Sequence, residues 1–349
     1  MKKILFAILF ALALVITPAL AESYAVLDGT VTSVSKYGNL TLSLPVSAAE
    51  EEGYATGDLV LLTVGDWSSA APVGTSYSDV DSGKPVVRFT GEYIEAAINY
   101  GSLASVSASG PGTSFTIAME EKEGYADEYL IRHLTRTEAR EDYASDEVFA
   151  NFRAVKAGNI RDSWLYRSCN PALKDARAPY ADGLSRKAGI RTAINLADKE
   201  EALETAEGYY ATLVQSGSVI ALDLGVDFFS PSFTEGLRNG FRFLISHEGP
   251  YLIHCNEGKD RAGLTIALLE ALCGASRDEI TSDYMQSFAN YFGTEPGTRQ
   301  YEAISKVISG FLSRLGADDT SIQQAAETYI IEVIGLSEAE TEKLKESLT

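Results

Sequence analysis

Residues 255–261, Cys-Asn-Glu-Gly-Lys-Asp-Arg, place a thiol, a glycine and two cations in one short stretch between two apolar segments. The first apolar segment ends at His254, and the second has helical spacing. Backbone N–H groups in a tight loop before a helix have no intrahelical acceptor, and with the helix dipole they bind an oxyanion. Gly258 permits backbone angles that a side chain would resist. Arg261 offers a planar set of donors that matches phosphate oxygens.

Cys255 begins this loop, where the positive field favours a nucleophilic thiolate. The sulfur is expected to attack phosphorus and form a phosphocysteine, which water then hydrolyses. The phosphoryl oxygens would be held by Arg261 and by the backbone of Asn256, Glu257, Gly258 and Lys259. Neither a metal nor a cofactor is expected, because amides and a guanidinium supply the charge stabilisation.

The elements that must position this loop are a strand and a helix. PYLIH (250–254) is typical of a buried strand, and the helix after it ends at Gly274. From Asn151 onward, the strand-like segments GIRTAINLA and SVIALDL alternate with helical ones, and Ser276–Glu279 has the pattern of a capping box. This alternation predicts an α/β domain whose central, mostly parallel sheet is flanked by helices.

His254-Cys255, five residues and then Arg261 before a helix resemble the signature of cysteine-based protein-tyrosine phosphatases. The form His-Cys-x-x-Gly-Lys-Asp-Arg-x-Gly is similar to the atypical bacterial tyrosine and dual-specificity branch, whose members can include phosphoinositide phosphatases. NFRAVKAGNIRDSWLYRSCNP and AGIRTAINLA resemble the start of that branch's catalytic domain. The resemblance covers roughly residues 150–290. It implies hydrolysis of phosphotyrosine, with phosphoserine and phosphothreonine as further candidates.

The leaving oxygen requires a proton, so a general acid is expected. The resemblance implies an Asp on a loop after the preceding strand or the Asp just before the motif arginine, and both are present as Asp227 and Asp260. Asp260 is slightly favoured, and Asp223 is a third candidate. The structural alternatives are that Asp227 ends a strand and that Asp260 forms an ion pair within the loop.

Several neighbours of the motif are expected to support it. His254 should hold the loop by hydrogen bonds, and Gly263 completes the motif. Lys259 either contacts a second anionic group or is solvated. Ala262 stands where the family usually has Ser or Thr, which predicts a slower second step or a substitute hydroxyl from Thr265.

The chain has three cysteines, so at least one thiol has no partner within it. Cys169 and Cys273 are interpreted as ordinary structural residues, although a protective disulfide to Cys255 is an open alternative. Arg167-Ser168 matches a Tyr-Arg-Ser element of the resembling family. Arg167 therefore lies either near the site or at the surface end of a strand.

The segment 25–119 alternates polar and apolar residues between turn signals, which predicts a small sheet or barrel. A short helix is expected at EYIEAAINYG (92–101). VTSVSKYGNLTLSLP, YSDV and EYIEAAINYGSLAS resemble the C-terminal β-domain of S-adenosylmethionine hydroxide adenosyltransferases. That family's catalytic domain is not evident, so the resemblance implies a shared fold and not adenosyl chemistry, with retained nucleotide binding as a less favoured alternative. This β-module is expected to position the phosphatase or to bind a surface partner.

The start, MKKILFAILFALALVITPALAES, is typical of a secretory signal peptide cut after Ala21, with an uncleaved anchor as the alternative. The signal peptide predicts a secreted or extracytoplasmic protein. No later apolar run is long enough to span a membrane. The predicted parts are a signal peptide (1–21), a β-rich domain (22–120), a connector (121–150) and a catalytic domain (151–349). The formal net charge of -20 argues against nucleic-acid and anionic-membrane partners.

Three functions are therefore weighed. The leading one is a secreted phosphomonoesterase that acts on phosphotyrosine. The second is a phosphoinositide or inositol-phosphate phosphatase with the same site. The third is a phospho-ligand-binding or adhesion protein with low turnover. The expected partner is a phosphorylated protein, a phosphorylated small molecule or a lipid headgroup.

Overall fold

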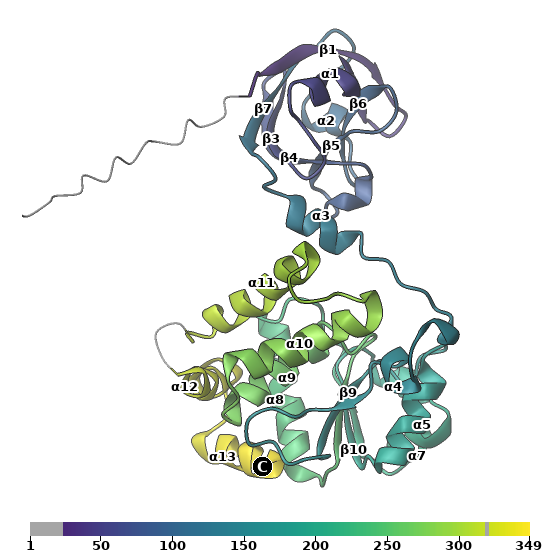
Figure 1. The fold of residues 1–349 in the computed structure, drawn as a ribbon, viewed down its shortest axis with the longest axis vertical. Coiled ribbons are helices and arrows are strands. Elements are labelled where there is room, and N and C mark those ends of the chain that lie inside the picture. The colour runs from purple at the N-terminus through teal and green to yellow at the C-terminus, as the bar shows by residue number, and fades with distance from the viewer. Residues whose placement is uncertain (1–23, 318–320) are drawn as a thin grey trace, which may run out of the picture. The chain divides into compact units, whose positions relative to one another are not determined.

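A computed structural model describes residues 24–317 and 321–349, so the predicted signal peptide lies outside the described residues. The chain divides into two compact units, one ending at Ala126 and the other running from Asp127 to Thr349 (Figure 1). The residues expected to form a connector are divided between them, and most belong to the second unit. Each unit is described separately below.

The first unit is a closed barrel with strand order β1-β2-β6-β5-β4-β3-β7. Its neighbouring strands are antiparallel except for β4 and β5. Alternate side chains fill the interior, as in β3, where Val60, Leu62 and Val64 are buried. The β-rich prediction is therefore confirmed. The strands are β1 (Leu27–Val34), β2 (Leu40–Pro45), β3 (Leu59–Val64), β4 (Trp67–Gly74), β5 (Pro85–Arg88), β6 (Tyr93–Ile98) and β7 (Ser114–Glu121), with short helices α1 (Val46–Glu51), η1 (Tyr77–Asp79) and α2 (Leu103–Val106).

The helix predicted at residues 92–101 is wrong, because this segment forms strand β6. Ala96 pairs with Leu40 of β2 on one side and with Val87 of β5 on the other. Ile94 and Ala96 are buried among the barrel residues. Pairing with two strands and burial of alternate side chains override the local helical preference of this segment.

The second unit is built on a five-stranded sheet with order β11-β10-β12-β9-β8. All pairs are parallel except β8 with β9, so the predicted α/β architecture with a mostly parallel sheet is confirmed. The strands are β8 (Arg153–Ala154), β9 (Leu165–Ser168), β10 (Thr192–Asn195), β11 (Val219–Ala221) and β12 (Tyr251–His254). The helices are α3 (Ala126–Arg132), which begins at the unit boundary, η2 (Arg140–Asp142), α4 (Asp146–Phe149), α5 (Ala178–Ala188), α6 (Glu200–Leu203), α7 (Gly208–Gln215), α8 (Pro231–Ser246), α9 (Arg261–Leu272), α10 (Arg277–Phe292), α11 (Arg299–Arg314), α12 (Ile322–Thr328), η3 (Tyr329–Ile334) and α13 (Glu338–Leu348).

Helices cover both faces of this sheet (Figure 1). On one face, Tyr251 and Ile253 of β12 share a hydrophobic core with α8 and α9. On the other face, Leu252 packs with residues of α5 and α7. Helix α9 is apolar on all sides and almost entirely buried, as expected of a helix in the centre of a domain. The sheet and this central helix fix the segment that joins β12 to α9.

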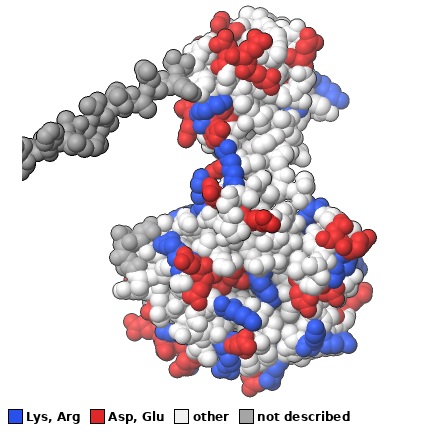
Figure 2. Space-filling view, viewed as in Figure 1, with Lys and Arg blue, Asp and Glu red and all other residues white. Residues whose placement is uncertain are grey.

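The surface carries charges of both signs. On the face shown in Figure 2, lysine and arginine side chains lie among acidic ones. Within residues 24–317 and 321–349, no helix is long and apolar enough to cross a membrane. The same residues contain no group of three or more His, Cys, Asp or Glu side chains that could hold a metal ion.

Candidate active site

The loop after β12 presents a row of backbone donors. Cys255 is only 3% exposed and directly follows the strand, and α9 begins at Arg261. The N–H groups from Asn256 to Gly263 donate no hydrogen bond to any described residue, and the first that does is Leu264, to the carbonyl of Asp260 at 2.9 Å. A row of unpaired N–H groups at a helix N-terminus is suited to an anion.

The carbonyl groups of the same loop are held by the surrounding protein. The carbonyl of Asn256 accepts from the N–H of Asn170 at 3.1 Å. The carbonyl of Glu257 accepts from Asn151 Nδ2 at 3.1 Å and from the Tyr291 hydroxyl at 2.7 Å. Because a peptide group points its C=O and N–H in opposite directions, fixing the carbonyls also fixes the direction of the free N–H groups.

Arg167 is the main support behind the loop, and its side chain is fully buried. Its guanidinium donates to the Gly258 carbonyl, at 3.1 Å from Nε and 2.6 Å from Nη2, and to the Lys259 carbonyl at 3.1 Å. It also pairs with the carboxylate of Asp283. Arg167 was expected either near the site or at the surface end of a strand. The structure places it beside the loop.

Asp283 joins two arginines in this buried group. Arg153 Nε lies 2.8 Å from one oxygen of its carboxylate, and Arg167 pairs with the other oxygen. Burial would raise the pKa of Asp283, but the two guanidinium groups outweigh burial and lower it. Glu270 is buried in the same group, and burial raises its pKa well above the usual value, so it is uncharged. Two guanidinium cations therefore face one ionised carboxylate, and the group keeps a positive charge behind the loop.

Two glycines make the close packing around Arg167 and Ser168 feasible. Gly258 has φ +66°, and a Cβ there would lie 2.1 Å from the Ser168 carbonyl oxygen. At Gly263, a Cβ would lie 2.9 Å from Arg167 Nη2 and 3.0 Å from the Tyr284 ring. A side chain at either position would push the loop or its supporting arginine away.

Arg261 is tied to the loop that follows β11. Its Nη1 donates to the Leu224 carbonyl at 2.7 Å, so the structure brings Arg261 together with the segment that contains Asp223 and Asp227. The Asp227 carboxylate accepts from the N–H of Phe229 at 3.1 Å, within the turn before α8. Asp223 is exposed and lies 4.0 Å from Lys199, and nothing links its side chain to Arg261.

Asp260 and Lys259 form an ion pair at the mouth of the loop, 3.6 Å apart. The Asp260 side chain is 60% exposed, yet desolvation by the protein around it raises its pKa, with Lys259 opposing that rise. Lys259 is only 15% exposed and also pairs with Glu257 at 3.1 Å. Its ammonium group lies 5.1 Å from the ring centres of Phe288 and Phe292, so this lysine is held at the site and not solvated.

His254 is buried and neutral at neutral pH. Its Nε2 lies 2.7 Å from the Tyr210 hydroxyl. Burial lowers the pKa of His254 to about 4, against the opposing charge of Asp198. The positive charge around the loop therefore comes from arginines, Lys259 and backbone dipoles and not from His254, which anchors the end of β12.

The first turns of α9 hold the remaining predicted positions. Ala262 is fully buried. Thr265 is also buried, and its hydroxyl has no hydrogen-bond partner among the described residues. Cys169, Cys255 and Cys273 are all buried and free, so the disulfide considered as an alternative is absent from the described structure.

Sequence reasoning missed several supporting residues. Asn151 and Arg153 lie in the stretch that resembles the start of the family's catalytic domain, but that resemblance gave them no role. Asp283 lies after the motif, and no local pattern marks it. Asp198 was also missed, and it accepts from Asn170 Nδ2 at 2.6 Å and from Asn195 Nδ2 at 2.9 Å. The one signal available for it was its position just after a predicted strand of a parallel sheet, where functional side chains gather.

Several solved structures are each similar to a part of this chain. The core catalytic domain of the PP-IP phosphatase SIW14 from S. cerevisiae is 20% identical over 48% of this chain and 93% of its own, with a TM-score of 0.29. An uncharacterized conserved protein from Thermotoga maritima is 23% identical over 29% of this chain (TM-score 0.26). A conserved hypothetical protein from Thermus thermophilus is 26% identical over 28% (TM-score 0.21). The chain spans only 40% and 37% of the lengths of these two bacterial proteins.

Among the curated proteins compared, none matches the chain. The model of the tyrosine phosphatase family, in contrast, matches residues 149–349, which include the whole sheet, the loop at Cys255 and the helices that follow. This match covers more than half of the chain. The chain therefore belongs to the tyrosine phosphatase family.

Proposed function

We propose that this protein hydrolyses phosphotyrosine through a phosphocysteine on Cys255, with phosphoserine and phosphothreonine as further substrates. One observation carries the proposal. Between Asn256 and Gly263 the backbone N–H groups have no partner among the described residues, while the loop carbonyls are bonded to the surrounding protein. Such preorganised donors stabilise charge that develops on phosphoryl oxygens. Cys255 lies at the start of the same loop.

In the first step, the Cys255 thiolate attacks phosphorus and the bond from phosphorus to the leaving oxygen breaks. A carboxylic acid gives its proton to the leaving oxygen, so the product leaves as a neutral alcohol. Arg261 uses one nitrogen to bind the Leu224 carbonyl, and its remaining N–H groups are proposed to bind the phosphoryl oxygens. In the second step, the same carboxyl group, now ionised, takes a proton from water, and the water oxygen attacks phosphorus. The bond from phosphorus to sulfur breaks, which releases inorganic phosphate and restores the thiolate.

The proton donor of the first step is proposed to be Asp260. Its raised pKa supports this role, because a general acid must be protonated when the substrate binds. Asp227 is the alternative, supported by the bond between its loop and Arg261. Asp223 has the weaker support of lying on that same loop.

A second function rests on Lys259. This cation lies beside the loop and is held among two carboxylates and two aromatic rings. A substrate with a second phosphate could displace those carboxylates, as would a phosphoinositide or an inositol phosphate.

A third function, capture of a phosphorylated ligand with low turnover, is supported by Ala262, which lacks the hydroxyl usual after the motif arginine. Thr265 is the proposed substitute, because its hydroxyl is on the next turn of α9 and lacks a partner among the described residues. Slow hydrolysis of the intermediate would let the phosphocysteine accumulate.

The experiment that tests the proposed function compares initial rates on phosphotyrosine and phosphoserine peptides, phosphoinositides and inositol phosphates. The variant is Cys255→Ser, and the matched control is Cys273→Ser at the far end of α9. We expect the wild type and the control to hydrolyse phosphotyrosine peptides, and Cys255→Ser to be inactive. Activity that survives in Cys255→Ser would refute the mechanism, and activity confined to inositol phosphates or phosphoinositides would assign the second function.

Secretion or an extracytoplasmic location is also proposed, on the pattern of residues 1–21. The test is to recover the protein from outside the cytoplasm of its own host and to determine its N-terminal residue. A chain that begins at Glu22 supports cleavage after Ala21. A chain that retains Met1 and stays inside the cell contradicts it.

A further inference from the structure

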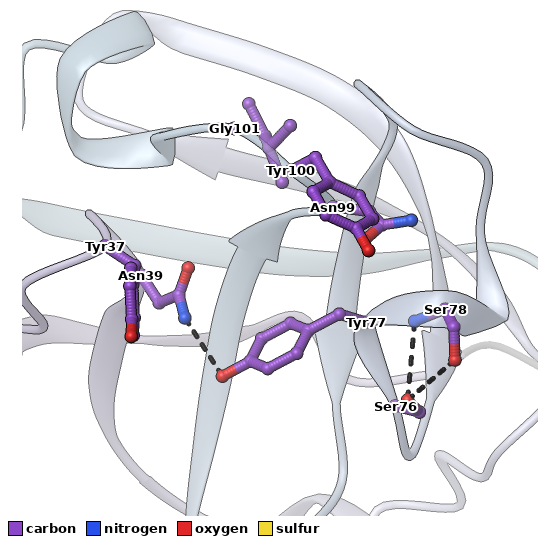
Figure 3. Close-up of a pocket in the computed structure, with 9 residues that line it drawn as sticks. Tyr37, Asn39, Ser76, Tyr77, Ser78, Asn99, Tyr100 and Gly101 are labelled. Atoms are coloured by element: carbon purple, nitrogen blue, oxygen red, sulfur yellow. Dashed lines mark hydrogen bonds between the residues drawn. The ribbon is translucent and has the colours of Figure 1, made fainter.

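The barrel unit contains a cavity of about 680 Å³ that is remote in sequence from the phosphatase motif. Figure 3 shows that Tyr37 and Asn39 lie on one side of it, Asn99 and Tyr100 on the other, and Tyr77 between them. These residues come from three separate connections of the barrel, after β1, β4 and β6. A cavity of this size is typical of a small-molecule site.

Two of its tyrosines are exposed to an unusual degree. Tyr100 is 93% exposed and Tyr37 is 68% exposed. The backbone of Tyr100 has φ +52°, a conformation that bulky residues rarely adopt because it costs strain energy. Burial of the ring cannot offset this cost, since the ring is in solvent. Exposed aromatic rings beside a cavity indicate a surface for a ligand.

The ring of Tyr77 is fixed between these two tyrosines. Its hydroxyl accepts from Asn39 Nδ2 at 2.9 Å and donates to Glu95 at 2.7 Å. The Arg88 guanidinium lies 3.9 Å from the centre of the ring and pairs with Glu95. The ring is thus preorganised, and the nearby charges of Arg88 and Glu95 neutralise each other.

The two asparagines supply hydrogen-bond acceptors. Asn39 Nδ2 donates to Tyr77, and Asn99 Nδ2 donates to the Val80 carbonyl at 2.8 Å. These bonds fix both amides, and neither Oδ1 accepts a hydrogen bond from a described residue. Two serines at the same cavity add hydroxyl groups that both donate and accept.

The lining residues that the structure describes carry no formal charge, which argues against an anionic ligand. None of the described residues that line it is Lys, Arg, Asp or Glu. A phosphorylated ligand would require a cation or a row of free N–H groups there. The lining instead combines aromatic rings with amides and hydroxyls, which match a neutral molecule with an apolar face and several hydroxyl groups.

We propose that this cavity binds a neutral saccharide. The C–H face of a sugar ring would pack on Tyr100 or Tyr37, and its hydroxyls would donate to Asn39 and Asn99 and exchange hydrogen bonds with the serines. A sugar is favoured over a nucleoside because it carries hydroxyls around its whole ring, and each can donate to an amide oxygen or exchange hydrogen bonds with a serine. A nucleoside has hydroxyls only on its ribose, so fewer of its groups match this lining. The proposal does not depend on the phosphatase activity.

The experiment uses the full chain and saturation-transfer NMR with four neutral tetrasaccharides: those of cellulose, chitin, starch and mannan. Adenosine is added as a non-saccharide probe. At least one saccharide should bind, and Tyr100→Ala should weaken its binding by about tenfold, because one stacked ring is lost. The matched control is Tyr93→Ala, which removes a tyrosine that is 42% exposed on β6 and does not line the cavity.

Binding that Tyr100→Ala weakens and Tyr93→Ala does not would support the proposal. Absence of binding by all four saccharides, or binding that Tyr100→Ala leaves unchanged, would overturn it. Adenosine binding in place of the saccharides would also overturn it. If Tyr100→Ala fails to fold, Tyr37→Ala provides the same test, and circular dichroism and thermal unfolding verify that each variant is folded.

Discussion

Arg167 donates two hydrogen bonds to the carbonyl oxygen of Gly258, 91 residues away in the chain. The arginine belongs to β9 and the glycine to the loop after β12, and the two strands are parallel neighbours in the sheet. Their register sets Ser168 opposite His254, so Arg167 and the loop meet at the carboxyl end of the sheet. The shape of the loop thus depends on a residue outside the motif.

Replacement of Gly258 by Ala should disrupt the loop. Its φ of +66° and the 2.1 Å approach to the Ser168 carbonyl leave no room for a Cβ. We expect a cost of at least about 1–3 kcal/mol in unfolding free energy and a loss of most phosphatase activity. Gly183→Ala is the control, since Gly183 lies in α5 with nothing within 4 Å of the added Cβ. Thermal unfolding and turnover of p-nitrophenyl phosphate check both, and a Gly258→Ala variant as active and stable as Gly183→Ala would contradict this account.

Replacement of Arg167 by Met should leave Asp283 with one guanidinium partner and the Gly258 carbonyl with none. Breaking a buried ion pair on one side typically costs about 3–5 kcal/mol. The control is Arg191→Met, which breaks the exposed pair of Arg191 with Glu248 and should cost about 0–1 kcal/mol. Denaturant unfolding measures both costs, and equal losses in the two variants would show that Arg167 is not a buried support.

His254 gives stability a specific pH dependence. The folded protein binds the proton only near pH 4, while the unfolded chain binds it near 6.5, so protonation favours unfolding between these values. The contribution of His254 is complete above pH 6.5 and falls by roughly 3 kcal/mol as the pH drops to about 4. The free energy of unfolding, measured at several pH values, should fall more steeply in the wild type than in His254→Gln. The control is His133→Gln, which replaces an exposed histidine and should keep the wild-type dependence of the unfolding free energy on pH. If His254→Gln shows the same pH dependence as the wild type, the assignment to His254 is refuted.

The general acid can be identified with two leaving groups. Asp260→Asn should lower turnover of phenyl phosphate by about 10²–10⁴-fold, and turnover of p-nitrophenyl phosphate much less, because p-nitrophenolate leaves without a proton. Since a general acid acts only below its pKa, the raised pKa of Asp260 should also extend activity to higher pH, and the variant should lose the alkaline limb of the profile. Asp227→Asn is the matched variant. The variant that loses more turnover of phenyl phosphate identifies the general acid. If both variants keep the wild-type rate, neither residue is the acid.

The strand, loop and helix around Cys255 could be predicted because they are contiguous in the sequence. The apolar run before His254 and the apolar run after Arg261 specify β12 and α9 locally, and the glycine between them indicates the turn. The free N–H groups of the loop follow from that local arrangement. Hence the candidate nucleophile and anion site were within reach of sequence reasoning.

The support of the loop could not be predicted in the same way. Arg167 and Asp283 are 116 residues apart, and their contact exists only because β9 and α10 meet behind the loop. Segment 92–101 shows the same limit, since its strand conformation depends on pairing with β2 and β5. Long-range pairing of this kind leaves no local pattern to read.

The most direct test of the central claim is to trap the covalent intermediate. The protein would be mixed rapidly with p-nitrophenyl phosphate and quenched in acid, and the peptide containing Cys255 would be analysed by mass spectrometry. This account predicts a phosphoryl group on Cys255 and a burst of nitrophenol of up to about one per enzyme, since Ala262 lacks the hydroxyl expected to speed the second step. Steady turnover with no phosphoryl group on Cys255, or with the group on another residue, would contradict it.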